Sequence, residues 1–150
     1  MEIERKFTVK HLPDLSEYTY LTLTQGYLCT EPVLRVRKEN DHYYLTYKGE
    51  GLLEREEYNL RLDKESFDHL LQKTDGVIIS KKRYLIPYNK HTIELDIFEE
   101  SLEPLIIAEV EFASVEEANA FTPPEWFDED VTMNPQYSNA YLSKQAKKDK

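Results

Sequence analysis

Charged residues of like sign recur two positions apart in several short segments of this chain. Arg35 and Arg37 form one such pair, and Glu109 and Glu111 form another. Residues two apart lie on the same face of a β-strand, so each pair places like charges side by side. A face that only meets water gains nothing from this repulsion. A multivalent counter-ion that bridges the two charges would explain it.

These positions form one basic set and one acidic set, and each set suits a different ligand. Arginine offers phosphate oxygens a bidentate fork and lysine a point charge. Carboxylates are hard-oxygen ligands for Mg²⁺ or Mn²⁺, which usually arrive with substrate phosphates. Together on one concave surface, the two sets would form a metal-assisted phosphate site. The bases are Lys6, Arg35, Arg37, Lys48, Arg55, Lys81 and Arg83, and the acids are Glu2, Glu4, Glu57, Glu94, Asp96, Glu109 and Glu111.

Length and composition exclude several other classes of protein. The 150 residues are 40% hydrophobic and 12% aromatic, which predicts one globular domain over residues 1–150. The formal net charge of −10 argues against a nucleic-acid binder that relies on bulk positive charge. A single cysteine, Cys29, excludes an intrachain disulfide and a thiolate zinc cluster. The charged first residues and the lack of a long apolar segment predict a cytoplasmic protein that does not bind a membrane.

Alternating polar and apolar residues, rich in Tyr, Thr, Val and Ile, predict a mainly β protein with a few peripheral helices (α+β). Two-residue turns at Asn40–Asp41 and Asn89–Lys90 favour antiparallel hairpins, and hence a barrel or a sandwich. The predicted strands are 2–9, 20–29, 33–38, 43–48, 53–61, 77–88, 92–98 and 105–113, and the predicted helices are 64–73, 115–121 and 139–148. Lys147, Lys148 and Lys150 are expected to be a solvated helix end.

Two arrangements of these strands fit the charge pattern. In one, the charged faces turn inward and line the cavity of a barrel, while the apolar faces pack against the helices. In the other, the charged faces simply meet water at solvated edge strands. The first arrangement is costly unless nearly every charge is paired or ligated, because an isolated buried ion costs several kcal/mol.

The order of these motifs resembles the CYTH superfamily, the triphosphate tunnel metalloenzymes, and in pattern comes closest to small bacterial inorganic triphosphatases. The opening EIERK has the ExExK form of that family, and YSN at 137–139 resembles an element near the family's carboxyl end. Between them lie Gln25 and Tyr27, RxR at 35–37, Lys48 in LTYKG, RxE at 55–57, KxR at 81–83, Asp96 in IELDIF and ExE at 109–111. The resemblance covers nearly the whole chain.

The resemblance implies an eight-stranded antiparallel tunnel whose lumen binds a triphosphate and one or two divalent cations, Mg²⁺ or Mn²⁺. Lys6, Lys48 and Glu111 would be catalytic. The implied metal ligands are Glu2, Glu4, Asp96, Glu109 and Glu111, with Glu57 less secure, and the implied phosphate binders are Lys6, Arg35, Arg37, Lys48, Arg55, Lys81 and Arg83. Many relatives carry another acid two residues after the RxE motif, where this chain has Asn59.

The function so implied is hydrolysis of a small-molecule triphosphate, with inorganic tripolyphosphate ahead of nucleoside triphosphates, and release of phosphate. Three alternatives stay open: a class IV-type adenylyl cyclase, a thiamine triphosphatase, and a non-catalytic triphosphate or polyphosphate binding module. Either a carboxylate or a lysine of lowered pKa would serve as general base. An exposed apolar barrel face would suit a homodimer, and no nucleic-acid partner is expected.

Overall fold

The computed structural model describes the backbone of residues 1–148 and the side chains of residues 1–144. Its strands form one antiparallel sheet in the order β10-β1-β9-β8-β7-β2-β3-β4-β6, with β5 paired to β1. The strands are β1 Glu2–Val9, β2 Tyr20–Thr30, β3 Val33–Glu39, β4 His42–Lys48, β5 Glu54–Arg55, β6 Glu57–Leu62, β7 Asp75–Tyr88, β8 His91–Phe98, β9 Ile106–Glu111 and β10 Phe127–Asp130. The mainly β, antiparallel prediction is confirmed.

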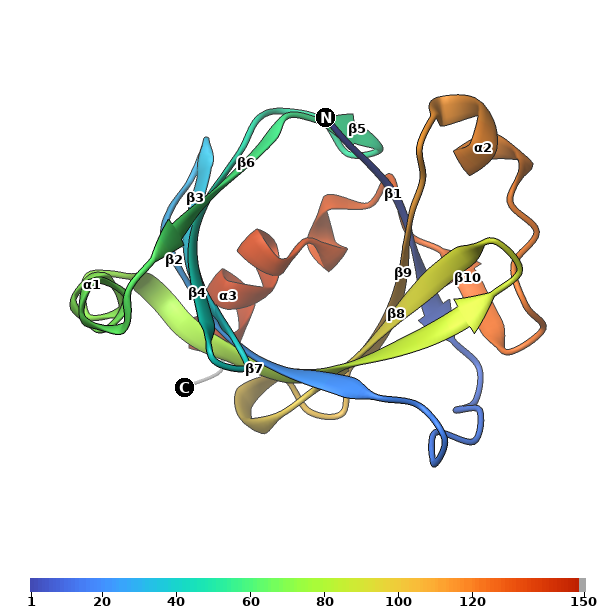
Figure 1. The fold of residues 1–150 in the computed structure, drawn as a ribbon, viewed down its shortest axis with the longest axis horizontal. Coiled ribbons are helices and arrows are strands. Elements are labelled where there is room, and N and C mark those ends of the chain that lie inside the picture. The colour runs from blue at the N-terminus through green and yellow to red at the C-terminus, as the bar shows by residue number, and fades with distance from the viewer. Residues whose placement is uncertain (149–150) are drawn as a thin grey trace.

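The sheet curls into a nearly closed ring, which Figure 1 shows end on. Its two ends meet where β5 pairs with β1: Glu2 lies opposite Arg55, and the amide of Glu4 donates to Leu53 O at 3.1 Å. The two hairpin turns lie at the positions predicted from the sequence. Asn40 and Asn89 adopt left-handed φ values of 52° and 55°, which two-residue turns between antiparallel strands require.

The strand count of eight was wrong in two places. The predicted strand 53–61 is divided between β5 and β6, which pair with different neighbours, β1 and β4. A further strand, β10, pairs with the outer edge of β1, and its sequence FDED lacks the alternation that would have revealed it. The predicted strand 2–9 matches β1, and the remaining strands differ from the prediction by one or two residues at their ends.

Helices cover the sheet in three places. The helices are α1 Lys64–Leu71, α2 Val115–Ala120 and α3 Asn139–Lys148, with 3₁₀ turns at Glu100–Leu102 and Pro135–Tyr137. On the outer face, α2 and β10 cover an apolar cluster that includes Phe7, Ile93 and Val110. On the inner face, Leu142 of α3 packs against Tyr27 and Ile79, so α3 lies within the outline of the ring (Figure 1).

None of the helices in residues 1–148 has the length and apolar character that crossing a bilayer requires. The predicted solvated end lies outside the described residues, because the structure describes no side chains for Lys147 and Lys148 and leaves out Lys150.

Candidate active site

The charged faces of the strands turn inward and line one cavity of about 180 Å³. Alternation explains this, because the apolar neighbours of these residues on β1, β8 and β9 face outward, where they pack in one cluster with α2 and β10. The cavity is lined by Glu2, Glu4, Lys6, Tyr27, Arg35, Arg37, Glu39, Lys48, Arg55, Glu57, Asn59, Arg83, Glu94, Glu109, Glu111, Ser138, Asn139 and Ala140. The solvated-strand alternative is therefore wrong for this chain.

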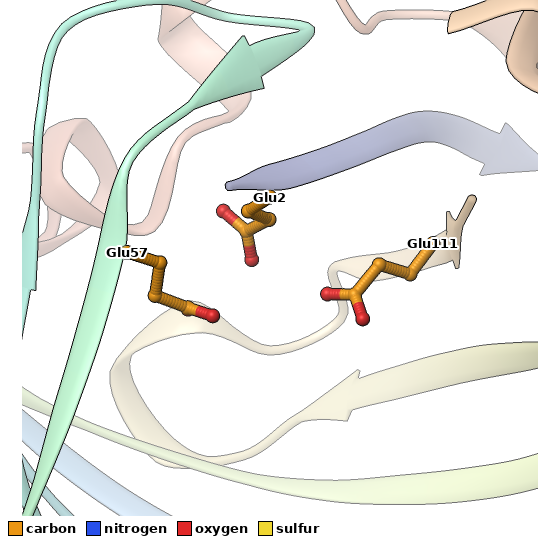
Figure 2. Close-up of side chains that lie close together, drawn as sticks. All are labelled: Glu2, Glu57 and Glu111. Atoms are coloured by element: carbon orange, nitrogen blue, oxygen red, sulfur yellow. The ribbon is translucent and has the colours of Figure 1, made fainter. Parts of the chain in front are cut away.

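Three carboxylates gather at one part of the cavity wall. Oxygens of Glu2, Glu57 and Glu111 lie within 4.8 Å of one another, and the three side chains approach from β1, β6 and β9 (Figure 2). The Lys48 ammonium lies 3.0 Å from Glu2 Oε1 and 3.6 Å from Glu57 Oε2. Its hydrogen bond goes to Glu2 Oε2, so the buried Glu2 Oε1 accepts none. A cluster of three carboxylates that contacts a single lysine fits a hard divalent cation.

Repulsion within this cluster appears in the pKa values. Burial, followed by the charges of Glu2 and Glu57, raises the pKa of Glu111 above its usual value. Burial would also raise the pKa of Glu57, but the nearby Lys48 and Arg35 outweigh it and lower that pKa. Glu111 therefore carries the uncompensated charge of the group, which a bound cation would relieve.

Further along the same two strands, β1 and β9 place charged residues in register. Glu4 lies opposite Glu111 and Lys6 lies opposite Glu109, whose Oε1 is 4.0 Å from the ammonium. Burial and then the charge of Glu109 raise the pKa of Glu4 to about 8. Burial would also raise the pKa of Glu109, but Lys6 and Arg83 hold it well below its usual value. One carboxyl of this neighbouring pair therefore keeps its proton near neutral pH while the other is ionised.

Lys81 and Asp96 lie behind the cavity wall rather than on it. Arg83 donates two hydrogen bonds to Asp96, from Nε to Oδ1 at 2.7 Å and from Nη2 to Oδ2 at 2.9 Å. Lys81 Nζ lies 2.7 Å from Asp96 Oδ2. Both Lys81 and Asp96 are fully buried. Burial lowers the pKa of Lys81 to about 8, even though Asp96 opposes the shift. The Asp96 carboxylate is thus committed to two cations of the protein.

The arginines of β3 form the opposite wall. Arg37 donates from Nε to Gln25 Oε1 at 3.1 Å, and burial followed by repulsion from Arg35 lowers the pKa of Arg37 to about 10. Arg35 is buried, and its Nε has no hydrogen-bond partner among the described residues. At the ring closure, Arg55 Nε donates to Gly49 O at 3.1 Å. This wall therefore offers an anion three guanidinium groups, including one buried N–H that has no partner among the described residues.

Comparison with known proteins identifies the family of this chain. The sequence matches the CYTH domain model over residues 1–140. The chain belongs to the CYTH family. This CYTH chain is 42% identical over 147 residues to the inorganic triphosphatase of Nitrosomonas europaea, which covers 95% of this chain and 96% of that one. It is 34% identical over 150 residues to the inorganic triphosphatase of Acetivibrio thermocellus, covering 95% and 93% of the two chains.

A solved structure also supports the CYTH assignment. The crystal structure of an inorganic triphosphatase superposes with a TM-score of 0.71 at 39% identity, covering 95% of this chain and 94% of that one. The predicted resemblance is therefore confirmed, together with its tunnel fold.

The CYTH tunnel brings together all the sequence-predicted site residues except two, Lys81 and Asp96, which stand behind its wall. It also contains residues that sequence analysis did not assign to the site. Glu39 lies two residues after Arg37, on the same face of β3. The predicted strand ended at residue 38 and therefore did not include Glu39. Glu94 was counted among the acids but given no role. Ala140 lines the cavity because α3 begins there, and the pattern of the strands does not predict where that helix lies.

Proposed function

We propose that this protein is a divalent-metal-dependent triphosphatase that hydrolyses inorganic tripolyphosphate. The observation that carries the proposal is the composition of the cavity wall. Bases from β3, β4 and β7 and carboxylates from β1, β6 and β9 face one space of about 180 Å³. Such a wall suits a compact polyanion and its counter-cation. The activity named for the two bacterial relatives supports the same conclusion.

The carboxylate cluster would hold the cation. Glu2, Glu57 and Glu111 supply three oxygen ligands, and their hard donor set suits Mg²⁺ or Mn²⁺. When bound, such a cation neutralises charge on phosphate oxygens and increases the acidity of coordinated water. Glu4 and Glu109 lie next to this cluster and are further candidate ligands. Asp96 also stays a predicted ligand, although Arg83 and Lys81 occupy its oxygens.

The bases would position the triphosphate and take up its charge. Arg35, Arg37, Arg55 and Arg83 would present guanidinium groups to phosphate oxygens, and Lys81, the remaining base of the predicted set, lies behind the wall. Phosphoryl transfer needs positioning and charge neutralisation more than covalent chemistry by the protein, with water attacking the terminal phosphorus in line.

Lys6 and Lys48 stand where the basic and acidic parts of the wall meet. Lys48 contacts Glu2 and Glu57, and Lys6 lies beside Glu109. From there each ammonium would stabilise charge that develops on oxygen as the anhydride bond breaks. We assign both lysines, with Glu111, to catalysis.

A substrate panel tests this proposal. Tripolyphosphate, ATP and thiamine triphosphate are each incubated with Mg²⁺, Mn²⁺ or EDTA, and orthophosphate, pyrophosphate and cyclic AMP are measured. We expect orthophosphate from tripolyphosphate, dependent on the metal. Pyrophosphate with cyclic AMP from ATP would replace this function with a cyclase. Faster release from thiamine triphosphate would change the substrate, and tight binding without turnover would identify a non-catalytic module.

Further parts of the proposal concern the whole molecule. We propose one domain over residues 1–150, a cytoplasmic location, and a small triphosphate rather than nucleic acid or membrane as the partner. A homodimer through the exposed apolar face of β6, which carries Tyr58 and Leu60, is the oligomer to test by light scattering.

A further inference from the structure

The first turn of α3 lies at the cavity wall. Ser138 caps this helix: its backbone is extended, at φ −73° and ψ 146°, and its Oγ accepts the amide of Tyr141 at 3.1 Å. Its carbonyl oxygen accepts the amide of Leu142 at 3.0 Å. The helix therefore begins at Asn139, and Ser138, Asn139 and Ala140 all line the cavity.

The amides of Asn139 and Ala140 have no acceptor within the described part of the chain. The first amides of a helix lack partners in the helix itself, and they point beyond its N-terminal end. Aligned peptide dipoles also place about half a positive charge there. Because this end lies at the cavity, its two free donors and its positive potential are available to an anion inside.

Lysines from two separate strands hold the start of α3. Lys6 of β1 donates from Nζ to Tyr137 O at 3.4 Å, and Lys81 of β7 donates from Nζ to Asn139 Oδ1 at 3.4 Å. Leu142, one turn further along, packs with Tyr27 in the inner apolar cluster. The amides of the first turn are thus fixed at the lumen before any ligand arrives, which lowers the entropic cost of binding.

An independent sign of a ligand lies next to this turn. Arg35 is only 3% exposed, yet its Nε has no hydrogen-bond partner among the described residues. Arg35 lies directly across the β2–β3 pair from Tyr27, and Tyr27 packs in one cluster with Leu142 of α3. Arg35, Tyr27 and the start of α3 therefore line the same cavity. A buried, unsatisfied guanidinium N–H requires an acceptor, and an anion in the cavity would supply it.

We propose that the N-terminus of α3 is a binding site for one phosphate group of the triphosphate, through the amides of Asn139 and Ala140, with Arg35 beside them. This inference rests on the proposed function, in which the lumen binds a triphosphate. If the inference holds, α3 is part of the substrate site. Its packing alone would indicate only that the helix covers the inner apolar cluster.

Two substitutions at one position separate the amide from the side chain. Asn139→Pro removes the N–H at the first helical position, where proline is best tolerated, and the extended Ser138 already has the conformation that a following proline demands. Asn139→Ala keeps the N–H and removes the same contact with Lys81, so it is the matched control. KM for inorganic tripolyphosphate is measured with Mg²⁺, and Kd is measured in EDTA by titration calorimetry.

We expect both constants to be about tenfold higher in Asn139→Pro than in Asn139→Ala, because a hydrogen bond to a charged group is lost. Melting temperatures and helical circular dichroism should match between the two variants. Equal constants in the two variants would overturn the inference while leaving triphosphate hydrolysis in place. A wild-type protein that neither binds nor hydrolyses tripolyphosphate would instead remove the proposed function.

A measurement on the wild-type protein tests the same point if Asn139→Pro destabilises the fold. The amide proton resonances of Asn139 and Ala140 are followed by NMR while tripolyphosphate is added. Both should move downfield as they donate to a phosphate oxygen. Resonances that stay fixed at saturating tripolyphosphate would exclude the site.

Discussion

Arg5 and Lys6 are adjacent cations on β1 that point to opposite faces of the sheet, and the protein treats them differently. Their side chains are similarly buried, at 18% and 15% exposure. On the outer face, Arg5 donates to Ala118 O and to Asp130 Oδ2, both at 2.8 Å. On the inner face, the carboxylate oxygen nearest to the Lys6 ammonium is 4.0 Å away.

The carboxylates around these cations differ in the same way. Asp130 forms an ion pair with Arg5 and also accepts hydrogen bonds from Thr132. Inside, Glu4 faces Glu111 directly across the β1–β9 pair, and two carboxyl groups opposite one another destabilise a sheet when both are ionised. The outer charges are therefore paired in a way that stabilises the fold. The inner charges lack such close pairing, which leaves them available to a bound ligand. Substitutions in the two regions should accordingly separate stability from activity.

The largest expected effect is on catalysis, from Glu111→Gln. Losing one carboxylate of the metal cluster should reduce kcat for tripolyphosphate by about 100-fold or more. Stability should be unchanged or higher, since the substitution removes a charge that Glu2 and Glu57 repel. Phosphate release and urea unfolding measure the two effects. Glu129→Gln, an exposed acid on β10, is the control, and full activity in Glu111→Gln would refute the metal role.

Arg5→Met should show the reverse pattern. The change removes one donor each from Asp130 Oδ2 and the carbonyl of Ala118, together with a guanidinium that lies 5.0 Å from the Phe7 ring centre. We expect the free energy of unfolding to fall by about 2 kcal/mol, with kcat/KM for tripolyphosphate unchanged. A loss of activity without a loss of stability would contradict the division between the two faces.

Much of this division could be predicted from local sequence. Period-two alternation identified the inward face of nearly every long strand, because side-chain direction depends only on position along the strand. The Asn89–Lys90 turn also determines which residues of its two strands lie opposite each other. A two-residue hairpin fixes the register of β7 and β8, and counting back from the turn places Arg83 opposite Asp96. That pairing would have separated Asp96 from the open carboxylate cluster.

Long-range contacts could not be predicted in this way. No turn links β1 to β9, so the juxtaposition of Glu4 and Glu111 depends on the pairing of two strands far apart in the sequence rather than on local sequence. The location of α3 at the cavity depends on contacts with β7 and β2, and the apolar spacing of the helix does not say which face of the sheet it covers. The lining by Ser138 to Ala140 follows from that placement alone.

Metal binding offers a smaller effect that also separates the two regions. Mg²⁺ at about ten times its Kd should stabilise the wild-type protein by about 1.4 kcal/mol, because it binds only the folded cluster. The gain should disappear in EDTA and in Glu111→Gln, and it should persist in Arg5→Met. Thermal unfolding monitored by circular dichroism measures it, and an equal gain in Glu111→Gln would move the metal site elsewhere.

The smallest effect is the pH dependence of the outer ion pair. Burial would raise the pKa of Asp130, but bonds from Thr132 and Arg5 outweigh it and lower the pKa below the usual 3.8. An acid whose pKa is lower in the folded state stabilises the protein above its unfolded pKa, and this contribution is lost as the pH falls through the folded pKa. Asp130→Asn should therefore cost about 0.5 kcal/mol at neutral pH, a small value because the carboxylate is 44% exposed. Near pH 3 and below, the difference from wild type in urea unfolding should shrink towards zero. A cost that stays constant down to pH 2 would mean that Asp130 acts through packing, and that the outer pair is not an electrostatic counterpart to the lumen.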